Sequence, residues 1–167
     1  MRFASALLRV LALTGALQAF AATAGGLING FRGVEWLDPP SSLGESAVQV
    51  QDPRIVDKTL TCFKRRADRL AINDIPLESI TYCFTRAQLT FVSIRLADRR
   101  HEAALIKAAT AAYGEPKAFE KATAVWEDDP RRGGGFAYFV AGTLALHSNE
   151  ARLAERIEEV KRARKDF

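Results

Sequence analysis

The chain has 167 residues, with 24 basic and 20 acidic side chains, a formal charge of +4 and 48% hydrophobic residues. This apolar content excludes a fully disordered chain, and the length fits one ordinary domain with its own core. Because the basic and acidic residues are mixed along the chain, the net charge indicates a solvated surface and no nucleic-acid partner.

The N-terminus has the pattern of a secretory signal peptide. Arg2 and Arg9 flank the start of an apolar run at 10–17, and small residues follow up to Ala24. This order predicts a signal peptide at 1–24 that is cleaved after Ala24, leaving a periplasmic or secreted protein. The apolar run is shorter than the about 20 residues that cross a bilayer, so we expect no transmembrane span in the mature chain. The alternative is an uncleaved N-terminal anchor, which would make the protein a membrane-tethered subunit.

Residues 25–46 form a glycine- and proline-rich leading segment ahead of the expected domain at 47–167. Two consecutive prolines in this segment stop any strand. Ser41 or Ser42 is suited to cap one short helical turn that ends at Gly44. We therefore expect an irregular leading segment with a single turn of helix.

A period-two pattern between residues 47 and 96 predicts strands. Residues 79–85 and 90–96 alternate apolar and polar side chains on either side of a turn at 85–88, which predicts an antiparallel hairpin. In the earlier part of this stretch the expected inward positions are Val48, Val50, Ile55, Leu60 and Phe63.

Helical spacing follows this hairpin. Apolar residues recur at helical intervals through 99–113, and the alanine-rich composition favours a helix as well. Asp98 stands where an N-cap belongs, while Gly114 and Pro116 prevent continuation. The pattern predicts one helix between these residues.

The remaining elements are three strands and a final helix. Strands are expected at 122–126, 136–140 and 143–147, the last two joined by a tight turn at 141–142. Residues 150–165 carry a single apolar stripe, typical of an amphipathic helix. The sequence therefore predicts an α+β fold, an antiparallel sheet of hairpins with one central helix and one C-terminal amphipathic helix packed against it.

Two cysteines, Cys62 and Cys83, lie in strand-like stretches of the mature chain. In an oxidising compartment such a pair predicts a disulfide, which would stabilise the fold by roughly 3 kcal/mol in the chain-entropy model. The alternative is two buried free thiols.

The motifs of common catalytic and metal sites are missing from the sequence. The histidines, His101 and His147, are isolated, and the cysteines have no metal-ligand spacing, so we predict neither a metal nor a cofactor. None of the serines stands in a G-x-S-x-G elbow, and the glycine run at 133–135 lacks the Lys of a phosphate-binding loop. These absences favour a protein that is not an enzyme. A hydrolase or ligand-binding enzyme whose site is assembled by the fold remains the alternative.

Two groups of residues are candidate binding surfaces. A basic cluster with Arg65, Arg66 and Arg69 would contact an anionic partner; the alternative, which the pattern favours, is a solvated strand edge. Aromatic residues beside glycine and proline breaks would line a shallow groove or complete the core. These aromatic residues are Phe31, Trp36, Trp126, Tyr138 and Phe139.

Two short motifs carry a resemblance. Residues 31–36 read F-R-G-V-E-W and residues 113–116 read Y-G-E-P. They resemble a diffuse group of small secreted bacterial proteins in which an F-R-G-[IV]-x-W segment precedes strand hairpins and a helix that ends Tyr-Gly-x-Pro. This chain has Leu37 where many members have Gly. The resemblance implies an exported α+β module and assigns no catalytic residue.

Taken together, these patterns predict an exported, non-enzymatic module that binds a protein or a cell-envelope component. Sheet edges and aromatic loops are the expected contact surface. A small periplasmic hydrolase is the alternative, and a pocket that gathers His147 or His101 with a Ser or a carboxylate would favour it.

Overall fold

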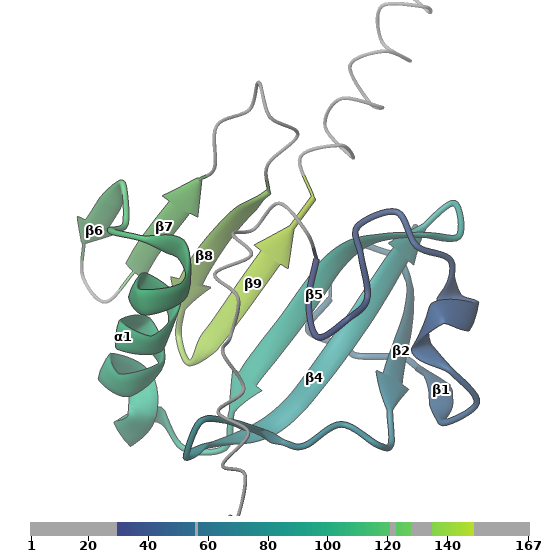
Figure 1. The fold of residues 1–167 in the computed structure, drawn as a ribbon, viewed down its shortest axis with the longest axis horizontal. Coiled ribbons are helices and arrows are strands. Elements are labelled where there is room, and N and C mark those ends of the chain that lie inside the picture. The colour runs from purple at the N-terminus through teal and green to yellow at the C-terminus, as the bar shows by residue number, and fades with distance from the viewer. Residues whose placement is uncertain (1–29, 56, 121–122, 128–134, 149–167) are drawn as a thin grey trace, which may run out of the picture.

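An antiparallel sheet of nine strands is the framework of the computed structural model, which describes residues 30–55, 57–120, 123–127 and 135–148. Eight strands follow one another across the sheet in the order β1-β2-β4-β5-β9-β8-β7-β6, and the short β3 pairs with β4 (Figure 1). The bounds are β1 Ala47–Val50, β2 Thr61–Arg65, β3 Ala71–Ile72, β4 Ile75–Thr85, β5 Gln88–Leu96, β6 Ala118–Glu120, β7 Thr123–Glu127, β8 Phe136–Val140 and β9 Thr143–His147.

Two tight hairpins build the centre of this sheet, and both were predicted. Strands β4 and β5 are joined through Arg86 and Ala87, and β8 and β9 through Ala141 and Gly142. All four turn residues have a positive φ, which is the backbone that two-residue hairpin turns require. Pairing of β5 with β9 then joins the two hairpins into one sheet.

Side-chain alternation gives the sheet two different faces. One set of positions is fully buried and includes Val92, Ile94, Leu144, Phe139 and Trp126; we call this side the helix face. The alternate positions form the other side, which we call the open face; in β5 and β9 they are Phe91, Ser93, Arg95, Thr143, Ala145 and His147.

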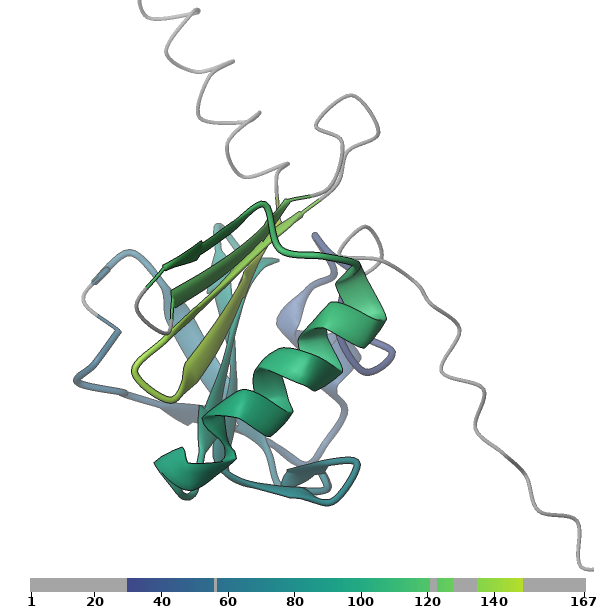
Figure 2. The same ribbon diagram turned by 90° about the vertical axis from the view of Figure 1, so that its left-hand side faces the viewer.

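Helix α1 (Glu102–Tyr113) covers the helix face next to β8 and β9 (Figure 2). Its buried residues Leu105 and Ala109 join the core. A 3-10 turn at Arg99–His101 leads into it, and Asp98 caps that turn by accepting a hydrogen bond from the Arg100 N–H at 2.9 Å. The predicted helix, its cap and its stop at Gly114 are confirmed, with the first turn wound more tightly than an α-helix.

The leading segment covers the rest of the helix face (Figure 1). Val34 and Leu43 are buried in the same core as α1, and backbone hydrogen bonds between Leu37, Asp38 and Leu89 attach the segment to the start of β5. The predicted helical turn is present as a 3-10 helix at Pro40–Leu43, although it begins at a proline rather than at a serine cap. Residues 31–43 are therefore packed as part of the same core.

The first strands differ from the prediction. Gln49 is opposite Phe63 in the β1–β2 register, so Val48 and Val50 lie on the face opposite to Phe63. Phe63 packs against the core as expected, but Val48 is 37% exposed. The prediction of Val48 and Val50 as inward positions was therefore wrong. Ile55 and Leu60 belong to the irregular connection between β1 and β2.

The α+β fold class is confirmed as a sheet-rich antiparallel fold with helix α1 against one face. The predicted signal peptide and its cleavage after Ala24, and the predicted helix at 150–165, lie outside the described residues. Within the described part of the chain, no helix has both the length and the apolarity to span a membrane.

Candidate functional site

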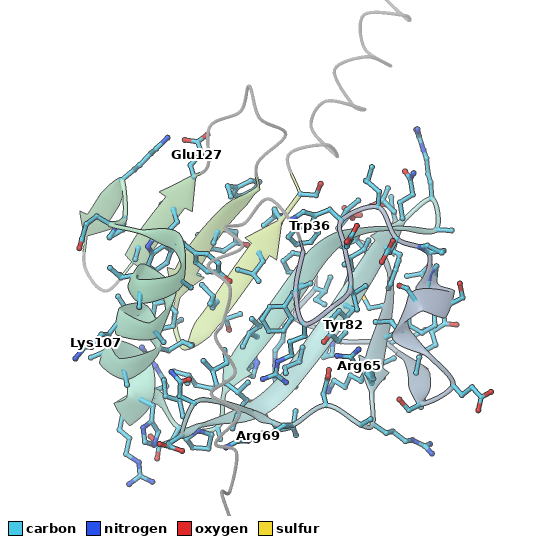
Figure 3. The ribbon with its side chains drawn as sticks, viewed as in Figure 1. Trp36, Arg65, Arg69, Tyr82, Lys107 and Glu127 are labelled. Carbon is cyan, nitrogen blue, oxygen red and sulfur yellow. A yellow bond between two sulfur atoms is a disulfide. The ribbon has the colours of Figure 1, made fainter. Side chains whose placement is uncertain are left out.

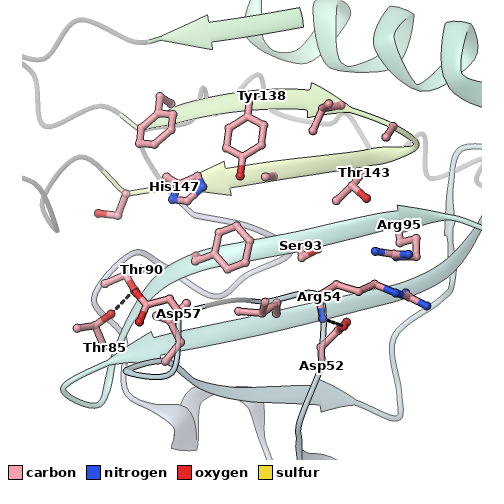
Figure 4. Close-up of a pocket in the computed structure, with 18 residues that line it drawn as sticks. Asp52, Arg54, Asp57, Thr85, Thr90, Ser93, Arg95, Tyr138, Thr143 and His147 are labelled. Atoms are coloured by element: carbon pink, nitrogen blue, oxygen red, sulfur yellow. Dashed lines mark hydrogen bonds between the residues drawn. The ribbon is translucent and has the colours of Figure 1, made fainter. Parts of the chain in front are cut away.

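A cavity of about 630 Å³ lies on the open face, between strands β5, β8 and β9 and the connection that joins β1 to β2 (Figure 4). Pockets that hold small ligands typically enclose about 300–1,000 Å³ and combine apolar walls with a few polar groups. This cavity has that size and that mixed lining, so it is the candidate site.

Aromatic rings form one end of the cavity. Phe91, His147 and Phe136 stand directly opposite one another on β5, β9 and β8, so their side chains make a row across three strands. The centre of the His147 ring lies 4.6 Å from the centre of the Phe91 ring and 4.4 Å from that of Phe136. The centre of the Tyr138 ring is 5.5 Å from that of His147. All four rings are half-buried, which leaves an apolar surface toward the cavity.

Arginines form the other end (Figure 4). Arg95 is on β5, four residues after Phe91, so it faces the same side of the sheet. Arg54 reaches the same place from the β1–β2 connection. Their guanidinium groups share the Glu78 carboxylate, at 3.2 Å from Arg54 Nη1 to Oε1 and 3.8 Å from Arg95 Nε to Oε2. One carboxylate thus stands between two positive charges.

Small and hydroxyl side chains separate these two ends. Ser93 and Ala145 are paired in register at the middle of the floor, and their size leaves space above the sheet. Nearer the aromatic end, the hydroxyls of Thr85 and Thr90 are hydrogen-bonded to each other at 2.9 Å. The cavity therefore changes along its length from aromatic to small and polar to cationic.

Two carboxylates on the β1–β2 connection also line the cavity, and both are hydrogen-bonded within that connection. Asp52 accepts a hydrogen bond from the Arg54 N–H. Asp57 accepts hydrogen bonds from the hydroxyl and the N–H of Thr59, which lower the pKa of Asp57 below its usual value. Both side chains shape the turns of the connection through these hydrogen bonds.

The five aromatic residues predicted as a binding surface do not come together. Tyr138 lines the cavity on the open face. Trp126 and Phe139 are 1% and 0% exposed on the helix face, because they occupy the alternate positions of β7 and β8. Phe31 and Trp36 pack against the core from the leading segment. Four of the five therefore belong to or support the core, the alternative named from the sequence.

The three arginines predicted as an anion contact make different contacts; Arg65 and Arg69 are labelled in Figure 3. Arg65 forms an ion pair with Asp68 at 2.7 Å and lies over the ring of Tyr82. Arg69 donates to the Asn73 carbonyl oxygen, whereas the side chain of Arg66 is exposed. These contacts tie chain segments together and do not build one anion site.

Tyr82 is the buried centre of this cluster. Its hydroxyl donates a hydrogen bond to Asp68 Oδ2 at 2.8 Å, and its ring contacts Phe31. Burial of the phenol and the adjacent Asp68 carboxylate hold the pKa of Tyr82 well above its ordinary value. The cluster thus anchors the leading segment to β4 as a structural contact.

The predicted disulfide between Cys62 and Cys83 is present, with the cysteines directly opposite on β2 and β4. Cys83 is in turn opposite Phe91, so the bridge lies on the open face next to the aromatic end of the cavity. Of the two histidines, His147 lies in the cavity and His101 on the turn before α1, so they do not converge. The described residues contain no cluster of three or more His, Cys, Asp or Glu side chains suited to a metal ion.

Sequence reasoning missed Phe91, Phe136 and the Arg54–Arg95–Glu78 group. A signal was present, because Phe91, Phe136 and His147 occupy the strand positions between the core residues, where a half-buried sheet usually carries polar side chains. No protein-family model matches this chain, and no significant match was found among curated proteins or among solved structures.

Proposed function

We propose that this protein is an exported, non-enzymatic module that binds a protein or another cell-envelope component through the open face of its sheet. The observation that carries the proposal is the cavity with its row of half-buried rings on a face that α1 leaves uncovered. Aromatic side chains contribute large apolar areas to binding surfaces, and a concave site with apolar walls and a few polar groups is where ligands usually bind.

Export is supported by the Cys62–Cys83 disulfide, because structural disulfides persist mainly in oxidising compartments. It is also supported by the N-terminal pattern that predicts cleavage after Ala24. The intact mass of protein recovered from the periplasm tests both points. We expect an N-terminus at Gly25 and a gain of about 2 Da on reduction, the mass of two hydrogens. A full-length mass would contradict cleavage and favour the anchored alternative.

The cavity gathers His147 with Ser93 and with the Asp52 and Asp57 carboxylates, the combination that favours the hydrolase alternative. We favour binding because both carboxylates are hydrogen-bonded within the β1–β2 connection and because the His147 ring is packed among aromatic rings. That ring is stacked on Phe136 with 5° between the planes and also contacts Phe91 and Tyr138. A hydrolase would need a hydroxyl nucleophile such as Ser93 activated by this ring. A fluorophosphonate that labels activated serines should leave the protein unmodified. Labelling that disappears in the His147→Ala variant would establish the hydrolase instead.

Site-specific photo-crosslinking tests the binding surface directly. A photoreactive residue in place of Thr143, at the cavity, should capture the partner when cells expressing the protein are irradiated. The matched control carries it in place of Lys107, which is exposed on α1. We expect a discrete adduct at the cavity position alone. Equal capture at both positions, or none, would contradict the proposal.

We also propose that the resemblance to the secreted bacterial group reflects a shared fold. Arg32 donates hydrogen bonds to the carbonyl oxygens of Arg69 and Ala71, and Trp126 Nε1 donates to the Gly114 carbonyl oxygen at 3.0 Å. Arg32 of the first motif thus attaches the leading segment to β3 and the residues before it. Gly114 of the second motif attaches the end of α1 to Trp126 of β7. These structural roles of the two motifs support a shared fold. Within such a group, the side chains of the open face would determine which ligand each protein binds.

A further inference from the structure

We propose that the cavity on the open face binds a small amphiphilic carboxylate, with its apolar chain on the aromatic end and its carboxylate at Arg54 and Arg95. This inference rests on the proposed function in that it uses the same face, and it specifies the chemistry of the ligand.

The first support is the polarity of the cavity along β5. Phe91 and Arg95 are four residues apart on one side of the strand, a separation of about 13 Å. The rings of Phe136, Tyr138 and His147 are gathered at the Phe91 end, and Arg54 joins Arg95 at the other (Figure 4). A ligand that follows the strand would meet apolar rings first and guanidinium groups last.

The second support is the chemistry of the arginine end. Glu78 contacts both guanidinium groups, so a carboxylate already fits between them. Each guanidinium has five N–H donors, and within the described residues Glu78 is the only ion partner of either one. The contacts with Glu78 leave further N–H donors on both guanidinium groups for a second carboxylate. The other two carboxylates that line the cavity, Asp52 and Asp57, are hydrogen-bonded to the Arg54 backbone N–H and to Thr59. Arginine binds carboxylates with paired, charge-assisted hydrogen bonds.

The third support is the shape of the middle. Ser93 and Ala145 have small side chains opposite each other, so the floor is low between the two ends. The volume of about 630 Å³ lies in the range of pockets that hold one small molecule. A single extended chain with a charged end is the simplest occupant that uses the rings, the low floor and the arginines together.

Calorimetric titration of the purified, disulfide-bonded protein with decanoate and with uncharged decanol tests this chemistry. We expect decanoate to bind about tenfold more tightly than decanol because of the charged hydrogen bonds. Each CH₂ removed from the acid should weaken binding about fourfold, the effect of one buried CH₂ group. Equal binding of acid and alcohol, or no dependence on chain length, would overturn the proposal.

Two variants and one control test the arginine end. Arg95→Gln should remove the preference for decanoate and leave decanol binding unchanged, whereas Glu78→Gln should strengthen decanoate binding about threefold by releasing both guanidinium groups. Lys107→Gln on α1 removes the same charge outside the cavity and should change neither affinity. Equal loss of decanoate affinity in Arg95→Gln and Lys107→Gln would mean non-specific charge attraction and would overturn the site.

Ser93→Leu fills the low middle of the cavity and should abolish binding of both ligands. Ala104→Leu, at an exposed position of α1, is the matched control and should bind normally. If Ser93→Leu fails to fold, as judged by its melting curve, Arg95→Gln and Glu78→Gln still decide the outcome. Failure of decanoate with capture intact at position 143 would overturn the ligand chemistry alone. Failure of both experiments would also overturn the proposed function.

Discussion

The helix face and the open face are formed by alternating residues of the same strands. They carry different side chains and are covered by different parts of the chain. On the helix face, Trp126, Phe139 and Ile94 are closed off by α1 and the leading segment. On the open face, Phe91, Phe136, Tyr138 and His147 are half-buried beside a cavity. Aromatic residues therefore stabilise the fold on one side and form a candidate binding surface on the other. Their effects on stability should differ accordingly.

The largest expected effect comes from the helix face. Phe139→Ala removes a ring that is 0% exposed and should lower the free energy of unfolding by about 3–5 kcal/mol. Tyr138→Ala, its neighbour on the open face, should cost less than half as much because that ring is only half-buried. Urea unfolding measures both. Similar losses for the two variants would contradict the division between the faces.

The next effect comes from the disulfide on the open face. Cys62 and Cys83 enclose a loop of sequence separation 21. Their joint replacement by serine should lower the free energy of unfolding by about 3 kcal/mol, mainly by releasing the unfolded chain. Thermal unfolding of the double variant beside the oxidised protein checks this. No change between the two would contradict a bridge that stabilises the native fold.

Tyr82 links the leading segment to the helix face, and its loss should have an intermediate effect. Tyr82→Phe removes the hydrogen bond to Asp68 and should cost about 2 kcal/mol, the usual contribution of a hydrogen bond to a charged group. Denaturant unfolding at neutral pH measures this loss. The prediction fails if Tyr82→Phe is as stable as the original protein.

The same residue predicts a dependence on pH. Folding raises the pKa of Tyr82 above its value of 10.0 in the unfolded chain, through burial and the Asp68 carboxylate. Its contribution to stability is therefore complete below about pH 10 and is lost as the pH rises above that value. The original protein should lose stability above about pH 10 more steeply than Tyr82→Phe. Parallel curves for the two proteins would contradict the assigned surroundings of the phenol.

The smallest effect has the opposite sign. Thr81 lies opposite Ser93 on the open face, and its buried hydroxyl has no hydrogen-bond partner among the residues that the structure describes. Thr81→Val keeps the shape and removes an unpaired polar atom, so it should stabilise the protein by about 1 kcal/mol. The free energy of unfolding of Ser79→Ala provides a comparison, because Ser79 is another buried polar residue of β4 and its hydroxyl is not among the unpaired buried atoms. A destabilised Thr81→Val variant would show that the hydroxyl is paired.

Local signals explain what could be predicted from the sequence. Gly142 and the short spacing around it define the β8–β9 hairpin, and Gly114 with Pro116 ends α1. Strands β3 and β6, by contrast, are too short to show a period. Such elements depend on their partners and carry little signal of their own.

The candidate site was not predictable because its parts are far apart in the chain. Phe91 meets His147 only through the pairing of β5 with β9, and Arg54 reaches Arg95 from an irregular connection. The aromatic prediction failed as a group for a related reason. Composition does not reveal which strand positions α1 covers, so Trp126 and Phe139 could not be separated from Tyr138.

Mapping of ligand binding by NMR would test most directly that the open face, and not the helix face, binds the ligand. Decanoate would be added to ¹⁵N-labelled protein while the backbone amide signals are followed. We predict that signals from β5 and β9 shift, especially between Phe91 and Arg95 and between Thr143 and His147, while those of α1 stay in place. Shifts centred on α1 and the leading segment, or no saturable shift at all, would contradict the account.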